Sequence, residues 1–190
     1  VGQGARSLTQ SPDGLTVAVL STIRRGQEIP IVERWDLQGG EAATPEKMAD
    51  KPLEGGSGQK ARRLLFSPDG KTLAALVEMG PFPFDPRKVL LWDLATGHTR
   101  AVGDMKDNHP PRVQGLAFSP NGGTLATADA DGRVTLWRLD VDPPTVRTEW
   151  TFPGPTTAVA FGPGGDYLAV GDGDGTVAVL RVPPAPPSGK

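Results

Sequence analysis

Few residues of this chain have side chains that could carry out a reaction or hold a metal ion. The sequence has two histidines, His98 and His109, and no cysteine, so disulfides, thiolate metal sites and a cysteine nucleophile are excluded. A metal-dependent hydrolase or lactonase would need several His, Asp or Glu side chains that converge on one point. The two histidines are poor material for such a site. We therefore expect no enzyme, no catalytic residue and no cofactor.

Two acidic segments have carboxylates at a spacing that calcium loops also use. Residues 129–132 read Asp-Ala-Asp-Gly and residues 172–175 read Asp-Gly-Asp-Gly. Both lack the glutamate that an EF-hand places at position 12 of its loop. They also occupy the same place in two copies of an internal repeat. We therefore interpret them as tight turns and expect no metal.

An internal repeat defines the elements that must position these residues. The first landmark is a turn sequence, Ser-Pro-Asp-Gly or a variant of it, at residues 11–14, 67–70, 119–122 and, in weakened form, 162–165. The second is Trp-Asp or a variant of it, at residues 35–36, 92–93, 137–138 and 180–181. Both landmarks recur every 43–57 residues, so each copy is one supersecondary module.

The third copy shows how such a module is built. Strands are predicted at residues 112–118, 124–128, 134–139 and 145–152. Residues 119–122 form a type I-like turn, and Asp131-Gly132 forms a tight hairpin turn. The inner strands are apolar on both faces, which is typical of sheets stacked between other sheets. A β-propeller stacks its blades in this way.

The repeat resembles the WD40 family over residues 5–182, most strongly in its second and third copies. Residues 116–122, 124–126 and 131–137 are close to the family's pattern, as are residues 65–74 with the ending at 91–93. TolB-like and lactonase-like propellers also use Ser-Pro-Asp-Gly turns. The Trp-Asp endings and the Asp-Gly-X-Val turn make WD40 the better match. The resemblance implies an all-β chain of four WD40-type β-propeller blades.

The family has a structural network of Trp, Ser or Thr, His and Asp within a blade. Matching positions in the third copy carry that network here: His109, Thr127, Asp131 and Trp137. The first, second and fourth copies keep single members, Trp35, Trp92 and Asp174. A His–Asp–Thr group could be taken for a catalytic triad. We interpret it as structural, with the carboxylate fixing the imidazole tautomer and the hydroxyl reaching the indole N–H.

The copies divide the chain into blades. The expected ranges are 1–55, 56–106, 107–154 and 155–182, with the last blade short of its outer strand and residues 183–190 a Pro-rich tail or linker. Four blades of the usual angle make a partial ring. Three alternatives stay open: the chain is a fragment of a longer protein, two copies form an eight-bladed dimeric ring, or the four blades close unusually or pack on another protein.

We expect a protein–protein interaction scaffold, because propeller ends are loops on a rigid frame. The expected partner-binding loops are residues 23–29, 79–88, 104–112, 128–133 and 153–155. Their candidate contact residues are Phe82, Phe84, Arg24, Arg25 and Arg87. Partners are other proteins, missing blades or a second copy in a homodimer. The alternative is a propeller that binds a small ligand or acts as a hydrolase or lactonase.

Composition excludes some partners and leaves the compartment open. The net charge of −2 gives no electrostatic reason to expect nucleic acid, and the Arg24-Arg25, Arg62-Arg63 and Arg87-Lys88 doublets are expected to be solvated turn charges. No apolar stretch is long enough for a membrane span. The Ala, Gly, Pro and Arg usage suggests a bacterial origin. The lack of cysteine favours the cytoplasm but fits an exported protein as well.

Overall fold

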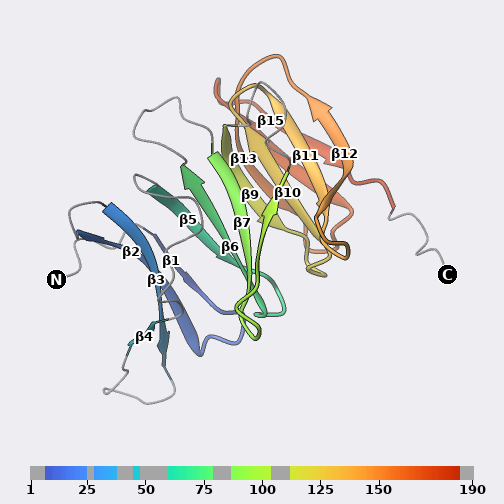
Figure 1. Ribbon diagram of the computed structural model, residues 1–190. Helices are drawn as coiled ribbons and strands as arrows, with labels where there is room; N and C mark the ends of the chain where they lie inside the picture. The colour runs from blue at the N-terminus through green and yellow to red at the C-terminus, as the bar shows by residue number, and fades with distance from the viewer. Residues whose placement is uncertain are drawn as a thin grey trace. The chain divides into compact units, whose positions relative to one another are not determined.

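The fold consists of antiparallel β-sheets (Figure 1). The computed structural model describes residues 7–24, 28–37, 45–47, 60–78, 87–103 and 112–184 of the chain. Their strands form four sheets, each built from strands consecutive in the sequence, which confirms the predicted all-β class and the four-sheet repeat. Among these residues no helix is long and apolar enough to cross a membrane.

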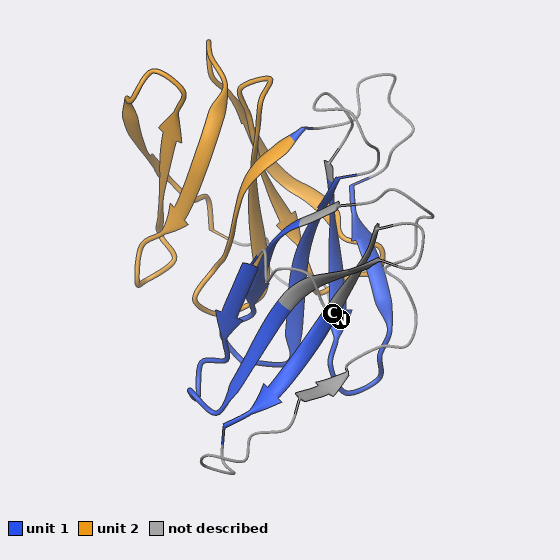
Figure 2. Cartoon of the chain, turned by 90° about the vertical axis from the view of Figure 1, so that its left-hand side faces the viewer, with its two compact units in different colours: residues 1–112 blue, residues 113–190 orange. Residues whose placement is uncertain are grey.

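The sheets belong to two compact units, residues 1–112 and residues 113–190 (Figure 2). The first sheet has the strands β1 (Ser7–Gln10), β2 (Thr16–Arg24), β3 (Glu28–Asp36) and β4 (Pro45–Lys47). The second sheet has the strands β5 (Lys60–Phe66), β6 (Thr72–Glu78), β7 (Arg87–Asp93) and β8 (Thr99–Val102). These two sheets make up the first unit.

The second unit contains the other two sheets. The third sheet has the strands β9 (Val113–Phe118), β10 (Thr124–Asp129), β11 (Arg133–Arg138) and β12 (Thr145–Thr151). The fourth sheet has the strands β13 (Thr156–Phe161), β14 (Tyr167–Asp172) and β15 (Val177–Arg181). Strand β10 is buried at all six positions, whereas β12 is mostly exposed, so the third sheet has a buried centre and an exposed outer strand.

The repeated turn sequence forms the same structure each time it occurs. In the second copy, Ser67 Oγ donates to Asp69 Oδ1 at 2.5 Å and accepts from the Thr72 backbone N–H at 2.9 Å. Gly70 closes the turn on Ser67 O with a φ of 69°, a left-handed value that glycine adopts without steric cost. Ser11 and Ser119 make equivalent bonds. The turn sequence therefore fixes the connection between the first and second strands of each copy.

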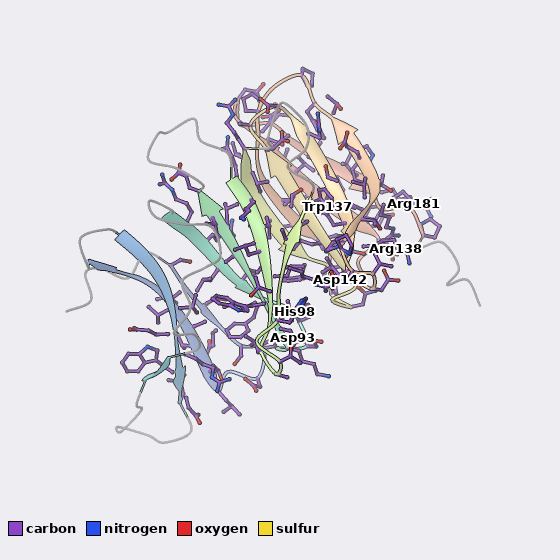
Figure 3. All side chains as sticks on the ribbon, in the orientation of Figure 1. Asp93, His98, Trp137, Arg138, Asp142 and Arg181 are labelled. Atoms are coloured by element: carbon purple, nitrogen blue, oxygen red, sulfur yellow. The ribbon has the colours of Figure 1, made fainter. Side chains whose placement is uncertain are left out.

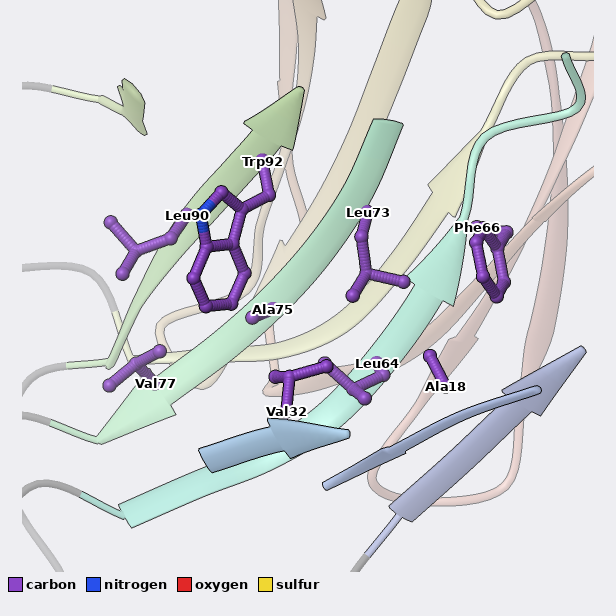
Figure 4. Packing of buried hydrophobic residues seen from close by; sticks show 9 residues of the cluster. All are labelled: Ala18, Val32, Leu64, Phe66, Leu73, Ala75, Val77, Leu90 and Trp92. Atoms are coloured by element: carbon purple, nitrogen blue, oxygen red, sulfur yellow. The ribbon is translucent and has the colours of Figure 1, made fainter. Parts of the chain in front are cut away.

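The core of the first unit lies between its two sheets (Figure 4). The first sheet contributes Ala18 and Val32, and the second sheet contributes leucine, valine, alanine and aromatic side chains that include Leu73 and Trp92. None of these side chains is more than 8% exposed. Burying one such aliphatic side chain contributes roughly 1.5–3 kcal/mol, so this layer holds the two sheets together.

The core of the second unit has the same arrangement. The third sheet turns Ala126, Ala128, Val134 and Leu136 toward Leu168 and Val170 of the fourth sheet, with Trp150 and Phe161 among the surrounding partly buried side chains. Each of the first six residues is at most 1% exposed. The fourth sheet therefore covers the central strands of the third on one face.

Close backbone approach joins the third and fourth sheets at their first strands. A Cβ added to Gly115 would lie 3.0 Å from the Ala158 Cα, which leaves no room for a larger residue without a shift. Thr156 is fully buried and donates to Asp129 O at 3.0 Å. Glycine at position 115 thus permits the contact, and the threonine hydroxyl satisfies a buried carbonyl there.

Two expectations about charged and loop residues are wrong. Arg62 is not a solvated turn charge: it lies in β5, and its guanidinium bonds the Glu78 carboxylate at 2.6 and 2.8 Å. Glu78 is 1% exposed, and a carboxylate buried to that extent requires a charged partner. Residues 23–29 are not all loop, because Ile23 pairs with Ile29 and Arg24 with Glu28 at the end of the β2–β3 hairpin.

Candidate functional site

The fourth sheet turns one set of alternating side chains away from the third sheet. We call this set the fourth-sheet face; its members are Ala158, Ala160, Tyr167, Ala169, Gly171, Val177, Val179 and Arg181. The register places Ala169 between Ala160 and Val179, and it pairs Tyr167 with Arg181 at one end of the sheet. The face therefore has a small, apolar centre and a polar end.

Large apolar side chains on this face are exposed. Val177 and Val179 are each 67% exposed, and Tyr167 is 55% exposed. Single exposed apolar residues are ordinary, but these lie together on adjacent strands, and contiguous apolar patches mark interaction sites.

The third sheet has an equivalent face, and there it is buried. Val134 pairs with Ala128, and Leu136 pairs with Ala126, in the register that pairs Val177 with Gly171 and Val179 with Ala169 in the fourth sheet. All four third-sheet residues are 0% exposed because the fourth sheet covers them. The fourth-sheet face thus has the composition of a surface that packs against another sheet.

The outer edge of the fourth sheet is also open. Strand β15 pairs with β14 on one side, and within the described part of the chain no strand lies on the other side. In the other sheets a fourth strand, β4, β8 or β12, occupies that position. An open edge presents backbone N–H and C=O groups that can pair with a strand of another chain.

Of the predicted Trp, Thr, His and Asp network, two members are bonded to each other. Trp137 Nε1 donates to Thr127 Oγ1 at 2.9 Å between β11 and β10 (Trp137 is labelled in Figure 3). Asp131 is exposed in the turn between β10 and β11. His109 lies outside the described residues. The role of the full network stays a prediction.

The equivalent tryptophans of the first two copies have different surroundings. Trp92 is 8% exposed and packs in the core of the first unit. The buried Trp35 Nε1 has no hydrogen-bond partner in the described part of the chain. Register explains this: Trp35 lies opposite Val17 as Trp137 lies opposite Leu125, and Val19 takes the place of Thr127. Valine has no oxygen to accept the bond.

The acidic turns use their carboxylates to hold the backbone. Asp129 Oδ1 accepts from the Asp131 and Arg133 N–H groups, both at 2.9 Å. Asp172 Oδ1 accepts from the Asp174 and Thr176 N–H groups at 3.3 and 2.9 Å. The first aspartate of each turn thus holds the hairpin, and in the fourth sheet Asp174 Oδ1 also accepts from the Thr176 N–H at 3.0 Å. Among the residues the structure describes, no group of three His, Cys, Asp or Glu side chains could hold a metal ion.

Aspartates in the repeated turns have altered acidity. The hydroxyl of Ser11 lowers the pKa of Asp13, and the backbone N–H of Leu15 lowers it further. The hydroxyl of Ser67 likewise lowers the pKa of Asp69, against a smaller opposing effect of burial. Hydrogen bonds to the ionised carboxylate are the cause in both turns, so these aspartates are structural anions rather than candidate proton donors.

The predicted loop residues at the partner-binding end are mostly not described. Phe82, Phe84 and Arg25 lie outside the described residues. Arg24 ends β2 and Arg87 begins β7, so both belong to strands rather than to loops; their side chains are outside the description. The predicted contact patch therefore stays a prediction.

A groove of about 360 Å³ lies within the second unit. It is bounded by the first turns of the third and fourth sheets and by the segment after β15. Its lining includes Asn121, Arg147, Phe161, Asp166, Arg181 and Pro183. Arg147 donates to Thr124 Oγ1 at 3.1 Å and to Pro183 O, so it links β12 to the end of the fourth sheet.

Comparison with known proteins shows likeness in sequence repeats and in fold. The family model for the WD domain, G-beta repeat, matches residues 91–138 and 147–179. The chain is similar to Kuenenia stuttgartiensis hydrazine synthase, with 18% identity and a TM-score of 0.69 over 94% of this chain and 59% of that one. It is also similar to a chain of a mitotic checkpoint complex, with 17% identity and a TM-score of 0.66 over 93% of this chain and 47% of that one. It thus spans 59% of the first chain's length and 47% of the second's. No curated protein matches.

Proposed function

Since this chain carries WD40 repeats at residues 91–138 and 147–179 and has the fold of β-propeller blades, we propose that it is a non-catalytic protein–protein interaction scaffold. WD40 propellers commonly have this role. One of the similar solved chains belongs to a mitotic checkpoint complex, which is a protein assembly.

The fourth-sheet face is the observation that carries the proposal. It combines exposed apolar side chains with an open strand edge, and the equivalent surface of the third sheet is covered by protein. A flat surface of alanine, glycine and valine fits another protein better than a small molecule, which usually binds in a concave site. Tyr167 and Arg181 at its end are of residue types that are enriched among binding hot spots.

The described polar residues support structural rather than catalytic roles. His98 is exposed in the turn after β7, and Asp93, the last residue of β7, accepts hydrogen bonds from the Ala95 and Thr96 backbone N–H groups (both are labelled in Figure 3). Asp129 and Asp172 hold hairpin turns. In these arrangements the carboxylates are committed to backbone donors, and no base is positioned against a nucleophile.

Cross-linking with residue-level mass spectrometry tests the proposal. The experiment compares the wild-type chain with a Val177→Asp/Val179→Asp double variant in extracts of the source cells. Val146→Asp is the matched control, because Val146 is 53% exposed on the outer strand of the third sheet. We expect cross-links from the fourth sheet to protein, either to another chain or to a second copy, that persist in the control and are lost in the double variant. No cross-links from this face, or equal cross-links in all three proteins, would contradict the proposal.

Small-ligand binding is the second candidate function, and the groove of the second unit favours it. Its volume of about 360 Å³ is within the usual range of ligand sites. Its aromatic ring, guanidinium groups and carboxylate could orient a molecule that carries both charges. A thermal-shift screen of zwitterionic metabolites tests this. A rise in melting temperature that Arg181→Ala abolishes would favour ligand binding. If no compound raises the melting temperature, the scaffold stays as the one proposed function.

A further inference from the structure

We propose that the fourth-sheet face binds the first sheet of a second copy of this chain, head to tail. This inference rests on the proposed function, since it names the partner of that same face. It starts from what covers the equivalent face in the third sheet.

The fourth sheet shows which kind of surface fits. The third sheet's Ala126, Ala128, Val134 and Leu136 pack against Leu168 and Val170 of β14, with Val159, Phe161 and Leu180 beside them. A surface of alanine, valine and leucine thus accepts aliphatic and aromatic side chains from a sheet of the next module, and the fourth-sheet face has valine at position 179 in place of that leucine. The first unit follows the same rule, with Ala18 and Val32 of the first sheet packed against Leu64, Leu73 and Trp92 of the second.

The first sheet has such a surface, and it is partly exposed. Register places Leu8, Gln10, Val17, Val19, Glu33 and Trp35 on the face opposite to Ala18 and Val32, and we call this set the first-sheet face. Leu8 is 69% exposed, whereas Leu64, its equivalent three residues before the repeated turn, is 3% exposed. Trp35 is half-buried, but Trp92 at the same place in the second sheet is 8% exposed. One chain therefore carries both complementary surfaces.

Polar groups on the two faces favour the head-to-tail pairing over like-with-like pairing. Arg181 ends the fourth-sheet face, and Glu33 lies on the first-sheet face. In the third sheet the equivalent Arg138 bonds Asp140 at 2.7 Å. Pro183 takes the place of that aspartate in the fourth sheet, so Arg181 has no neighbouring carboxylate two residues on. Two fourth-sheet faces would bring arginines together and two first-sheet faces would bring glutamates together, whereas the mixed pair brings opposite charges.

A contact between two different faces either closes into a ring or continues as an open chain of copies. The proposal covers both, because the same two surfaces meet in each. What it requires is that blocking either surface stops association.

Light scattering after size exclusion, with sedimentation velocity over a dilution series, tests the proposal. At about 100 μM, well above a micromolar Kd, we expect the wild-type chain to have at least twice its 19.9 kDa mass. Leu8→Asp, which blocks the first-sheet face, and Val177→Asp/Val179→Asp, which blocks the fourth-sheet face, should each be monomeric. Val146→Asp should associate like the wild type. Circular dichroism melts verify that all variants are folded.

Mixing the two blocked variants is the decisive step. The Leu8→Asp chain keeps its fourth-sheet face and the double variant keeps its first-sheet face, so an equimolar mixture should form a heterodimer although each alone is a monomer. A monomeric wild type would overturn the proposal, as would self-association of the Leu8→Asp variant or a mixture that stays monomeric. A wild-type monomer whose fourth sheet still cross-links to another protein would refute the second copy as partner and leave the scaffold function standing.

Discussion

The indole N–H of Trp137 donates a 2.9 Å hydrogen bond to Thr127 Oγ1 and so joins two central strands of the third sheet. Thr127 is buried, and the bond satisfies a polar atom that would otherwise be removed from water. The same pair of positions in the first sheet holds Trp35 and Val19, and there the bond is absent. The comparison gives two matched experiments.

Replacing Thr127 with valine removes the acceptor and keeps the shape of the side chain. We expect the free energy of unfolding to fall by about 1–3 kcal/mol, because the indole N–H loses its partner. Urea denaturation of Thr127→Val, Trp137→Phe and the double variant measures this. A coupling energy of about 0.5–3 kcal/mol is expected between the two sites, and strict additivity would show that the bond does not stabilise the fold.

The reverse change in the first sheet should stabilise it. Val19→Thr places a hydroxyl where Thr127 stands in the third sheet, within the register that brings Trp35 close. We expect a gain of roughly 0.5–1.5 kcal/mol from the new bond. The measurement is urea denaturation, with Val19→Ala as the control that removes the methyl groups without adding an oxygen. A Val19→Thr chain no more stable than wild type would refute the expectation.

His109 is predicted to belong to the same network as Trp137. His109→Ala should then lower the free energy of unfolding by about 1–3 kcal/mol. His98→Ala is the control, because His98 is exposed in a turn and its loss should change stability by less than about 0.5 kcal/mol. Equal stability of both variants would contradict the network.

Two equivalent glycines differ in the space around them. A Cβ at Gly132 would clash with the carbonyl oxygens of Phe152 and Gly154, whereas a Cβ at Gly175 would meet nothing within 4 Å. Both have left-handed φ, 83° and 94°. Gly175→Ala should therefore cost about 1–2 kcal/mol for backbone strain alone, and Gly132→Ala clearly more, measured as midpoints of thermal unfolding. Equal costs would show that the segment after β12, which carries these two carbonyl groups, moves aside freely.

The hydroxyl of Ser67 lowers the pKa of Asp69. A carboxyl with a lowered pKa stabilises the native state above the unfolded value of about 3.9, and the effect is lost as pH falls through the native value. Ser67→Ala should raise the pKa of Asp69, as an NMR titration of its side chain would measure. Between about pH 5 and pH 3 the variant should also lose less stability than wild type, because its Asp69 pKa lies closer to the unfolded value. An unchanged pKa would show that the backbone N–H of Lys71 is sufficient.

Local structure was predictable where residue type dictates backbone geometry. The second strand of the third copy was expected at residues 124–128 and is Thr124–Asp129, because the turn before it and the Asp-Gly turn after it set its length. The hairpin at residues 23–29 was underestimated, since the Ile23–Ile29 pair prolongs it beyond what the flanking polar residues suggest. The tight turn predicted at Asp131-Gly132 is present, and Asp129 accepts hydrogen bonds from its backbone N–H groups.

Burial was not predictable in the same way. Val134 and Val177 stand at equivalent places in β11 and β15, yet one is 0% and the other 67% exposed. The difference depends on whether another sheet lies over them, and the residue types of a single strand do not show whether one does. Glu78 is a similar case: a charged residue at the end of an apolar strand is expected in solvent, and it is buried because Arg62 of the neighbouring strand reaches it.

The fourth sheet repeats the outward surface of the third, position by position. Each module thus presents to the next module a surface like the one that it packs against itself. Such a module can be duplicated in a gene without a change in either neighbour. Insertion or deletion of a whole module with these surfaces then keeps similar side chains at the junction, whereas a partial module would not. Arrays of this kind are therefore free to differ in length between related genes by full copies, while the side chains at each junction stay under the same constraint.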